Sequence, residues 1–410
     1  MTAIWTAALV LGGAVYCGFI LTALVGILRH KRNPASNTRL PRVSVIVSAR
    51  NEEAEIGSTL DSLLAQDYPD FEIIVINDRS TDRTAEIIRA NPKVRLIQQT
   101  EVPPGWSPKK AALLKGIKAS TGEIIVATDA DCRHPDGWIN ALVTALVPVA
   151  PTSLSVSSPV APTSLSVSSP VAPTSLSVSF LPPEFERPTG TSVLPAMVIG
   201  QARFDIGPNP PLWQRLQALD FTSQEILSAG LASAGTPFNC SGASIAYSRK
   251  SFDQVGGWQG VEGFVSGDDE LLMAKFVKAG IPVVAAFSPE SVVRTRPPES
   301  LRAVWRQRVR WGSKTLHYAW SRKLTLSGIF IFYLALTLTP VVSFMGAPFI
   351  AAVVAFFLKL VVDGALLVTG GRLFGDKIAP LDFLIAELLH PPLIVAMAIA
   401  GAFGKVRWKD

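Results

Sequence analysis

Two aspartates stand at the end of an apolar stretch near the middle of the chain. In "VATDADC", Val126–Cys132, Asp129 and Asp131 are separated by a single alanine. Two carboxylates at the end of a buried strand need a compensating cation, because an unpaired buried charge is costly. The Asp-x-Asp spacing offers hard oxygen ligands that suit Mg²⁺ or Mn²⁺ with a bound diphosphate. The competing interpretation is a solvated turn, in which aspartate is common.

A second acidic cluster, "GDDELL" at Gly267–Leu272, opens a predicted helix. Acidic side chains stabilise a helix N-terminus, so a purely structural capping role is one interpretation. The functional interpretation is a general base. In that case a partly desolvated carboxylate, Asp268 or Asp269, takes the proton of a hydroxyl group as the hydroxyl attacks.

Basic residues that suit an anionic ligand occur in two places. Lys109 and Lys110 begin a predicted helix, where a phosphate would be stabilised, although a solvated helix end has the same composition. In "QRVRW", Gln307–Trp311, Arg308 and Arg310 can neutralise a leaving diphosphate, and the tryptophan can stack on a sugar ring. Arginine and tryptophan beside a membrane segment are also ordinary anchors, which is the alternative interpretation.

These groups need a scaffold, and the chain around them alternates strands with helices. Val43–Val47, Ile73–Ile76, "KVRLIQQ" and "EIIVATDADC" predict four buried strands. Helical segments separate them, which is typical of an α/β fold with a doubly wound, mainly parallel sheet. Ligands bind at the carboxyl ends of such strands. Glu52 follows the first strand and Asp78 the second, as Asp129 follows the fourth.

Further elements are predicted in the later part of this region. "AMVIGQARF", residues 196–204, is expected to form one strand, and "PLWQRLQALDFTSQEILSAGLA" a long helix. Before them, the unit "PVAPTSLSVSS" begins at Pro148, Pro159 and, with a final Phe, at Pro170. Such copies can build a repeat fold. Their Pro, Ser and Thr content favours a tandem duplication in a surface loop, residues 148–180.

Both ends of the chain are apolar. Ile4–Leu28 is uncharged, long enough to cross a bilayer and followed by a basic run. That order favours a retained anchor with a cytoplasmic C-terminal end over a cleaved signal peptide. At the other end, Leu324–Leu358 has a break at Gly346–Phe349, which predicts a hairpin of two crossings. Lys359 and Asp363 can pair in the second crossing, unless that segment is tilted or interfacial.

The last apolar stretch, Ile378–Phe403, is interrupted by Asp382, Glu387 and "HPP", so it spans, re-enters or lies on the membrane. The basic C-terminal "KVRWKD" is expected inside, and one of the C-terminal segments is therefore expected not to span. The predicted organisation is an N-terminal anchor at 1–30, a cytoplasmic domain at 31–323 and membrane segments with a short basic tail at 324–410.

Composition limits the class of partner. The net charge of +6 fits a domain held against anionic lipid or one that binds polyphosphate ligands. Nucleic acid is not expected, because no basic run is interleaved with aromatic residues. The three cysteines form no CxxC pair, which indicates neither a disulfide framework nor a zinc site.

Together these motifs resemble the family 2 glycosyltransferases, inverting membrane enzymes with a GT-A fold. The resemblance covers Arg42–Trp311 apart from the duplicated loop. It rests on motifs in a fixed order: "VSVIVSARNEE", "INDRSTDRT", "KKAALLKG", "ATDADC", "CSGASIAYSRKSFDQVGGW", "SGDDELL" and "QRVRW". The last is similar to the Q-x-x-R-W element of cellulose, chitin and hyaluronan synthases and of ceramide glucosyltransferase.

The resemblance implies a role for each matching position. It assigns the nucleotide and donor sugar to Ala49, Glu52, Asp78, Lys109, Asp129 and Asp131. A Mg²⁺ or Mn²⁺ ion would be held by Asp131 with Asp129 beside it. Asp269 matches the catalytic base, and because this chain reads Asp268-Asp269 there, either carboxylate can be that base. The diphosphate and acceptor would be enclosed by Gln307, Arg310 and Trp311.

The expected activity is transfer of a sugar from a UDP- or GDP-linked donor to a lipid-linked or membrane-proximal hydroxyl, on a lipid or glycan acceptor. The expected location is the cytoplasmic face of a bacterial inner membrane. Two alternatives are a polyprenyl-phosphate glycosyltransferase and a processive polysaccharide synthase; the few membrane segments favour transfer of one or few sugars. More distant alternatives are a non-catalytic membrane scaffold and a nucleotidyltransferase. The sequence does not fix the oligomeric state.

Overall fold

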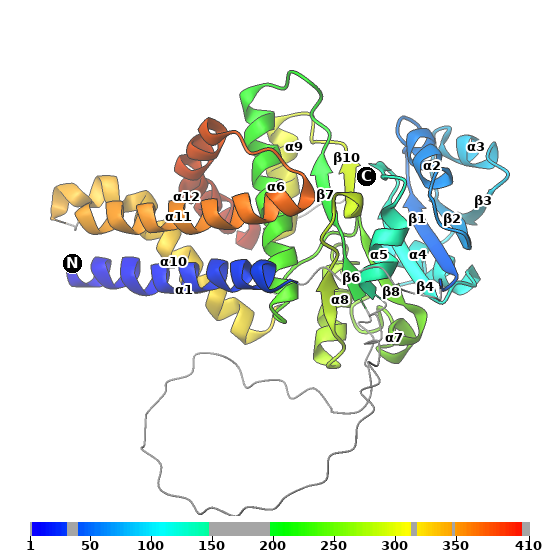
Figure 1. Ribbon diagram of the computed structural model, residues 1–410, viewed down its shortest axis with the longest axis horizontal. Helices are drawn as coiled ribbons and strands as arrows, with labels where there is room; N and C mark the ends of the chain where they lie inside the picture. Colours follow the sequence, from blue (N-terminus) through cyan, green and yellow to red (C-terminus); the bar gives the residue numbers. More distant parts are fainter. Residues whose placement is uncertain (1, 31–39, 147–196, 313–317, 347–348, 404–410) are drawn as a thin grey trace, which may run out of the picture.

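The computed structural model describes residues 2–30, 40–146, 197–312, 318–346 and 349–403. The expected repeat loop, 148–180, lies outside these residues. Figure 1 shows a sheet domain on one side and a group of long helices on the other, with helix α6 standing between them.

A seven-stranded sheet forms the centre of the domain, in the order β3-β2-β1-β4-β8-β6-β9. Its parallel half consists of β1 (Val43–Ala49), β2 (Phe71–Asp78), β3 (Val94–Gln99) and β4 (Ile124–Asp129). The other half consists of β8 (Ile245–Ser248), β6 (Met197–Ile199) and β9 (Val283–Ala285). Only β8 is antiparallel to its neighbours, so the predicted mainly parallel α/β sheet is confirmed.

Helices cover the sheet because β-branched residues fill both of its faces. The helices of this domain are α2 (Ile56–Leu64), α3 (Thr84–Arg89), α4 (Pro108–Ala119), α5 (Trp138–Leu146), α7 (Arg249–Gln254) and α8 (Glu270–Lys278). Ser80 and Asp82 are of the residue types that usually occupy an N-cap, and either could be predicted to cap α3, but Arg83 occupies that position. Asp82 still pairs a backbone N–H group of the first turn of α3, since its carboxylate accepts a hydrogen bond from Thr84 N at 3.0 Å.

The single strand expected at 196–204 is wrong. Gly200 divides it into β6 and β7 (Gln201–Phe204), which belong to different sheets. A Cβ atom at Gly200 would lie 2.0 Å from Ser244 Oγ, so the chain bends where only glycine fits. Strand β7 pairs with β10 (Val292–Thr295), which also pairs with β5 (Cys132–Arg133). This small sheet brings the segment after Asp131 against β10.

Four helices are long and apolar enough to cross a membrane: α1 (Thr2–Arg29), α10 (Trp320–Val342), α11 (Phe349–Phe374) and the Pro380–Gly401 part of α12 (Pro380–Phe403). A short 3-10 turn, η3 (Ser343–Met345), follows α10 near the expected break. Lys359 Nζ lies 2.8 Å from Asp363 Oδ2, so the expected i, i+4 pair forms.

Helix α6 (Leu212–Ser233) connects the two halves of the molecule. It packs on β7 and β9 of the sheet domain and on α1, α11 and α12. Two ion pairs reinforce the junction: Arg203 with Asp376 at 2.7 Å, and Arg215 with Asp382 at 2.8 Å. Helix α9 (Leu301–Gly312) packs against α12 on the same side.

Candidate active site

The two acidic motifs meet at one lysine. Asp129 ends β4, and Lys109 lies in the first turn of α4. The Lys109 Nζ atom is 2.7 Å from Asp129 Oδ1 and 3.0 Å from Asp268 Oδ2. Burial alone would lower the pKa of Lys109, but Asp129 and Asp268 outweigh it and raise that pKa well above its usual value. Lys109 is therefore a fixed cation between two carboxylates, not a solvated helix end.

Asp131 lies beside this group, where its side chain contacts β10. Thr295 Oγ1 of β10 donates a hydrogen bond to Asp131 Oδ2 at 3.2 Å. Burial, and then the nearby charge of Asp129, raise the pKa of Asp131. Two carboxylates that disfavour each other's charge in this way provide a place for a divalent cation.

The site offers two neighbouring carboxylates to a Mg²⁺ or Mn²⁺ ion, Asp129 and Asp131. Among the described residues, no group of three or more His, Cys, Asp or Glu side chains could hold a metal ion. Mg²⁺ is commonly held by one or two carboxylates together with substrate phosphates. Asp131 and Asp129 supply that number of carboxylates.

Asp269 both caps a helix and faces the candidate site. Its Oδ1 accepts a hydrogen bond from Glu270 N at 2.6 Å, at the start of α8. Its Oδ2 accepts one from Gly242 N at 2.7 Å. The same carboxylate lines the cavity that contains Lys109 and Asp129. The capping and functional interpretations are therefore compatible.

Lys110 does not contact a ligand position. Its side chain is fully buried, and its Nζ donates hydrogen bonds to Val261 O at 2.6 Å and Phe264 O at 2.8 Å. These bonds fix the loop that precedes Asp268. The expectation of an anion-binding or solvated Lys110 is wrong, because its charge is used to hold backbone carbonyl groups.

The proposed nucleotide-binding residues lie at the ends of β1 and β2. Ala49 ends β1, Glu52 follows it, and Asp78 ends β2. Asp78 is buried, with Arg79 Nε at 2.8 Å and Gln99 Nε2 at 2.9 Å from its Oδ1. These three residues do not line the cavity that contains Asp129 and Asp269.

Helix α9 brings the aromatic and basic motif to the acids. Gln307, Arg310 and Trp311 line the same cavity as Lys109, Asp129, Asp131, Asp268 and Asp269. Burial lowers the pKa of Arg310, although Asp268 and Asp269 act in the opposite direction. Arg310 is thus a desolvated cation that faces the carboxylates.

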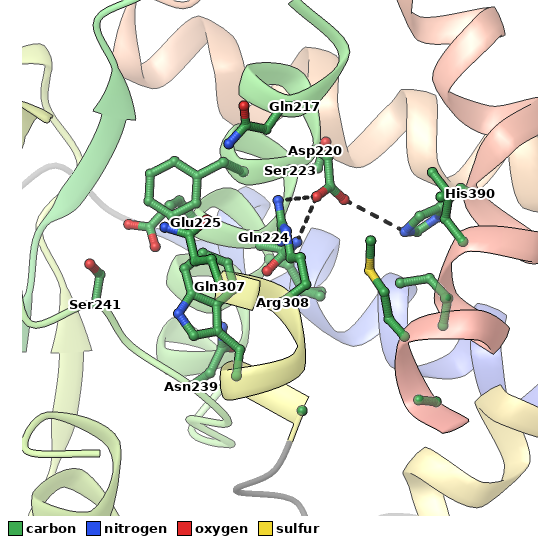
Figure 2. A pocket seen from close by; sticks show the side chains of 18 of the residues that line it. Gln217, Asp220, Ser223, Gln224, Glu225, Asn239, Ser241, Gln307, Arg308 and His390 are labelled. Atoms are coloured by element: carbon green, nitrogen blue, oxygen red, sulfur yellow. Dashed lines mark hydrogen bonds and ion pairs between the residues drawn. The ribbon is translucent and has the colours of Figure 1, made fainter. Parts of the chain in front are cut away.

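Arg308 has another role. It is buried, forms an ion pair with Asp220 of α6, and stacks on the Trp311 ring with its guanidinium carbon 4.7 Å from the ring centroid. The expectation that Arg308 neutralises a diphosphate is therefore wrong, because Asp220 already neutralises it. Figure 2 shows Asp220 between Arg308 and His390, whose Nε2 is 3.7 Å from Asp220 Oδ1.

The cavity is large, about 1540 Å³, and connects the two halves of the molecule. One end holds the acidic group and the α9 motif. The walls continue along α6 and then between α10 and α12, where the lining includes Leu326, Phe330, Leu393, Ile394 and Met397. The catalytic candidates thus share one space with apolar residues of helices that could lie in a membrane.

Sequence reasoning missed the α6 residues of this cavity. Gln217, Asp220, Gln224 and Glu225 line it, although their helix carries no recognised motif. The spacing of Gln217, Asp220 and Gln224 by three and four residues was readable, because side chains so spaced share a helix face. The partners of Asp220 on α9 and α12 are distant in sequence, so the spacing alone could not assign this face to the cavity.

Similarity to known proteins agrees with this architecture. Residues 41–313 match the family described as glycosyltransferase like family 2. The β-monoglucosyldiacylglycerol synthase of Synechocystis sp. is 26% identical over 343 residues, which cover 76% of this chain and 59% of that protein. A probable glycosyltransferase of Bacillus subtilis is 40% identical over 97 residues, or 22% of this chain and 23% of that protein. The chain thus spans less than two thirds of the length of each of these relatives.

One solved structure resembles the chain over almost its whole length. It is a mannosyltransferase from Pyrobaculum calidifontis in complex with GDP-Man and Mn²⁺, with a TM-score of 0.56 and 20% sequence identity. The alignment covers 98% of this chain and 99% of that one. At this identity the likeness establishes the shared fold.

Proposed function

Because the chain belongs to the glycosyltransferase like family 2, we propose that it transfers a sugar from a nucleotide-diphosphate sugar to a hydroxyl group of a membrane lipid. The observation that carries this proposal is the continuous cavity. It has carboxylates and Arg310 at one end and apolar residues of α10 and α12 at the other. A lipid acceptor needs both environments, whereas a soluble acceptor needs only the first.

The donor would bind across the carboxyl ends of the parallel strands. Ala49, Glu52 and Asp78 would hold the nucleotide, which is UDP or GDP. Lys109 and Asp129 would lie beside the donor sugar and its diphosphate. Mg²⁺ or Mn²⁺, held by Asp131 with Asp129, would neutralise the diphosphate charge when bound. The Pyrobaculum structure contains GDP-Man and Mn²⁺, which supports this donor class by analogy.

The acceptor hydroxyl would lose its proton to Asp269 as its oxygen attacks the anomeric carbon. The bond to the diphosphate oxygen breaks on the opposite face, so the configuration inverts and the electron pair leaves with the diphosphate. Asp268 is less available as a base, because Lys109 Nζ lies 3.0 Å from its Oδ2. Arg310 would stabilise the departing charge, and Gln307 and Trp311 would orient the acceptor.

The organisation that fits this activity is a membrane-embedded enzyme. Residues 1–30 would anchor the chain, 31–323 would form the catalytic domain at the cytoplasmic face of a bacterial inner membrane, and 324–410 would complete the membrane part. The Synechocystis relative is named for a glucosylated diacylglycerol, which supports a lipid acceptor.

The test is donor turnover and transfer by the full chain, purified in detergent. UDP- and GDP-sugars would be supplied with Mn²⁺ and bacterial lipid extract to wild type, Asp131→Asn, Asp269→Asn and Asp253→Asn. The last replaces an exposed acid on α7 and serves as a matched control.

We expect labelled lipid product from wild type and the control. Asp269→Asn should lower transfer by about 10²- to 10⁴-fold, the usual contribution of a general base. Asp131→Asn should lower both transfer and the Mn²⁺ response. Full transfer by Asp269→Asn would exclude Asp269 as the base, and long polymeric product would exclude transfer of one or few sugars.

A further inference from the structure

One face of α6 forms a polar wall in the middle of the cavity. Gln217, Asp220 and Gln224 follow one another at spacings of three and four residues, and all three line the cavity. Gln224 Nε2 donates a hydrogen bond to Asp220 Oδ2 at 3.1 Å. Figure 2 shows these residues around the same space as Gln307 of α9 and His390 of α12.

Two glutamines beside this space, one on α6 and one on α9, have side-chain atoms without a hydrogen-bond partner among the described residues. The Gln217 side chain is only 7% exposed, and neither its Nε2 nor its Oε1 has a hydrogen-bond partner among the residues that the structure describes. The buried Gln307 Oε1 is also without a partner there. Leaving a buried polar group unpaired is unfavourable, so these amides call for a ligand with both donors and acceptors. Hydroxyl groups meet that requirement.

The charges on this wall disfavour an anionic ligand. The Arg308 guanidinium is already paired with Asp220 and stacked on Trp311. A phosphate placed beside Gln217 would therefore approach Asp220 and a cation that Asp220 already neutralises.

Beyond this wall the lining becomes apolar. The lining there includes Leu326, Ile329 and Phe330 of α10 and Leu393, Ile394 and Met397 of α12. Acyl chains can leave the membrane interior for such a lining without exposing apolar surface to water.

We infer that Gln217 and Gln307 bind the uncharged, hydroxyl-bearing headgroup of a lipid acceptor whose acyl chains lie between α10 and α12. This inference rests on the proposed transfer to a lipid hydroxyl and names the chemical class of that lipid. Gln217 contacts the headgroup through its amide, which accepts from the hydroxyl group and donates to that hydroxyl or to an ester carbonyl oxygen. The wall on α6 thereby selects uncharged, hydroxyl-bearing headgroups over phosphorylated ones.

The experiment compares two lipids that differ by one phosphate group. Dioctanoylglycerol and dioctanoyl phosphatidic acid would be offered to the purified full chain, alongside a polyprenyl phosphate, with the UDP- or GDP-sugar that the preceding turnover experiment selects. Gln217→Leu would be compared with Gln214→Leu, a control on the same helix whose side chain does not line the cavity. Donor hydrolysis in the absence of lipid would be measured for every variant.

We expect transfer to dioctanoylglycerol and no inhibition of that transfer by phosphatidic acid, which carries a phosphate in place of the free hydroxyl group. Gln217→Leu should raise the KM for dioctanoylglycerol about three- to ten-fold, the value of one hydrogen bond, and leave donor hydrolysis and donor KM unchanged. Gln214→Leu should match wild type in the KM for dioctanoylglycerol, in donor hydrolysis and in donor KM.

Three results would overturn the inference. They are an unchanged acceptor KM in Gln217→Leu, a parallel loss of donor hydrolysis in that variant, and either inhibition by phosphatidic acid or preferred transfer to the polyprenyl phosphate. Donor hydrolysis by wild type without transfer to dioctanoylglycerol would overturn this inference and leave the glycosyltransferase proposal standing. No donor turnover by wild type would overturn both.

Discussion

Lys109 is the residue whose charge holds the two acidic motifs together. If it is replaced by methionine, Asp129 and Asp268 lose the cation between them, and the diphosphate meets a more negative site. Truncating one member of a hydrogen-bonded, partly buried charge pair commonly costs 2 kcal/mol or more. We therefore expect Lys109→Met to lower kcat/KM for donor hydrolysis by at least about thirty-fold.

The control for this prediction lies on the same helix. Lys115 is close to the surface, where its Nζ donates to Gln98 O at 2.7 Å. Lys115→Met should retain wild-type kinetics. A donor KM and kcat in Lys109→Met equal to those of wild type would show that the Lys109 charge has no part in donor binding.

Glu225 should make stability depend on pH. Burial raises its pKa to about 7 from a usual 4.5, although Arg203 acts in the opposite direction. Between pH 4.5 and 7 the native state thus binds a proton that the unfolded chain has released, so this group's contribution to the unfolding free energy falls as pH rises. Glu225→Gln removes the dependence. Its stability relative to wild type should increase from pH 4.5 to 7 and then level off.

Thermal unfolding in detergent at several pH values would check this. Glu86→Gln, at an exposed position of α3, is the control and should run parallel to wild type. A constant difference between Glu225→Gln and wild type across the whole range would mean that Glu225 does not titrate there.

Residue identities alone indicated part of the site. Asp129, Asp131 and Asp269 could be named because each lies at the end of a strand or start of a helix that the pattern itself predicts. Lys110 and Arg308 could not be assigned, since their roles depend on partners far along the chain. Lys110 binds carbonyl groups of the Val261–Ser266 loop, and Arg308 binds Asp220.

At the scale of elements, the junction between α1 and α6 depends on two glycines. A Cβ atom on Gly26 would lie 2.0 Å from Gly230 O, and one on Gly230 would lie 2.5 Å from Ala23 O. The two helices can approach this closely only without side chains at the crossing. Gly26→Val should therefore force them apart, at a cost of about 1–3 kcal/mol or more for overpacking.

Thermal unfolding and monodispersity in detergent are the measurements for this change. Gly18→Val on the same helix is the matched control, because nothing lies within 4 Å of a Cβ there. The control should behave as wild type while Gly26→Val loses stability. Equal melting temperatures for the two variants would mean that α1 and α6 are not held at this contact.

The elements differ in how far the sequence predicts them. The strands of the parallel half were readable because they are continuous runs of β-branched residues buried on both faces. The division of residues 197–204 between two sheets was not, since it depends on Ser244 packing against Gly200. The long helix α6 was predicted, but its position between the two halves arises from contacts that no local pattern records.

At the scale of the whole molecule, the long apolar helix α12 differs in its direction and contacts from the other three, α1, α10 and α11. The end of the bundle far from the catalytic domain is marked by Trp5 Nε1, which donates to Thr339 Oγ1 at 3.0 Å. Figure 1 shows α1 and α11 extending from that end toward α6, whereas α12 runs across them. Near its start, Asp382 pairs with Arg215 of α6. Near the end of α12, Gly401 lies against Gly312 of α9, since a Cβ atom on Gly312 would be 3.6 Å from Gly401 Cα.

Both ends of α12 thus contact helices on the catalytic side, and a helix that crosses the membrane cannot do this. We expect α1, α10 and α11 to span and α12 to lie along the inner surface, which places the basic C-terminus with the catalytic domain. A C-terminal green fluorescent protein fusion should then fluoresce. In a variant without the native cysteines, Ser343→Cys should react with a membrane-impermeant maleimide in intact cells, and Lys377→Cys only after permeabilisation. A C-terminal alkaline phosphatase fusion that is active in intact cells would instead place the C-terminus outside, and α12 would be a fourth span.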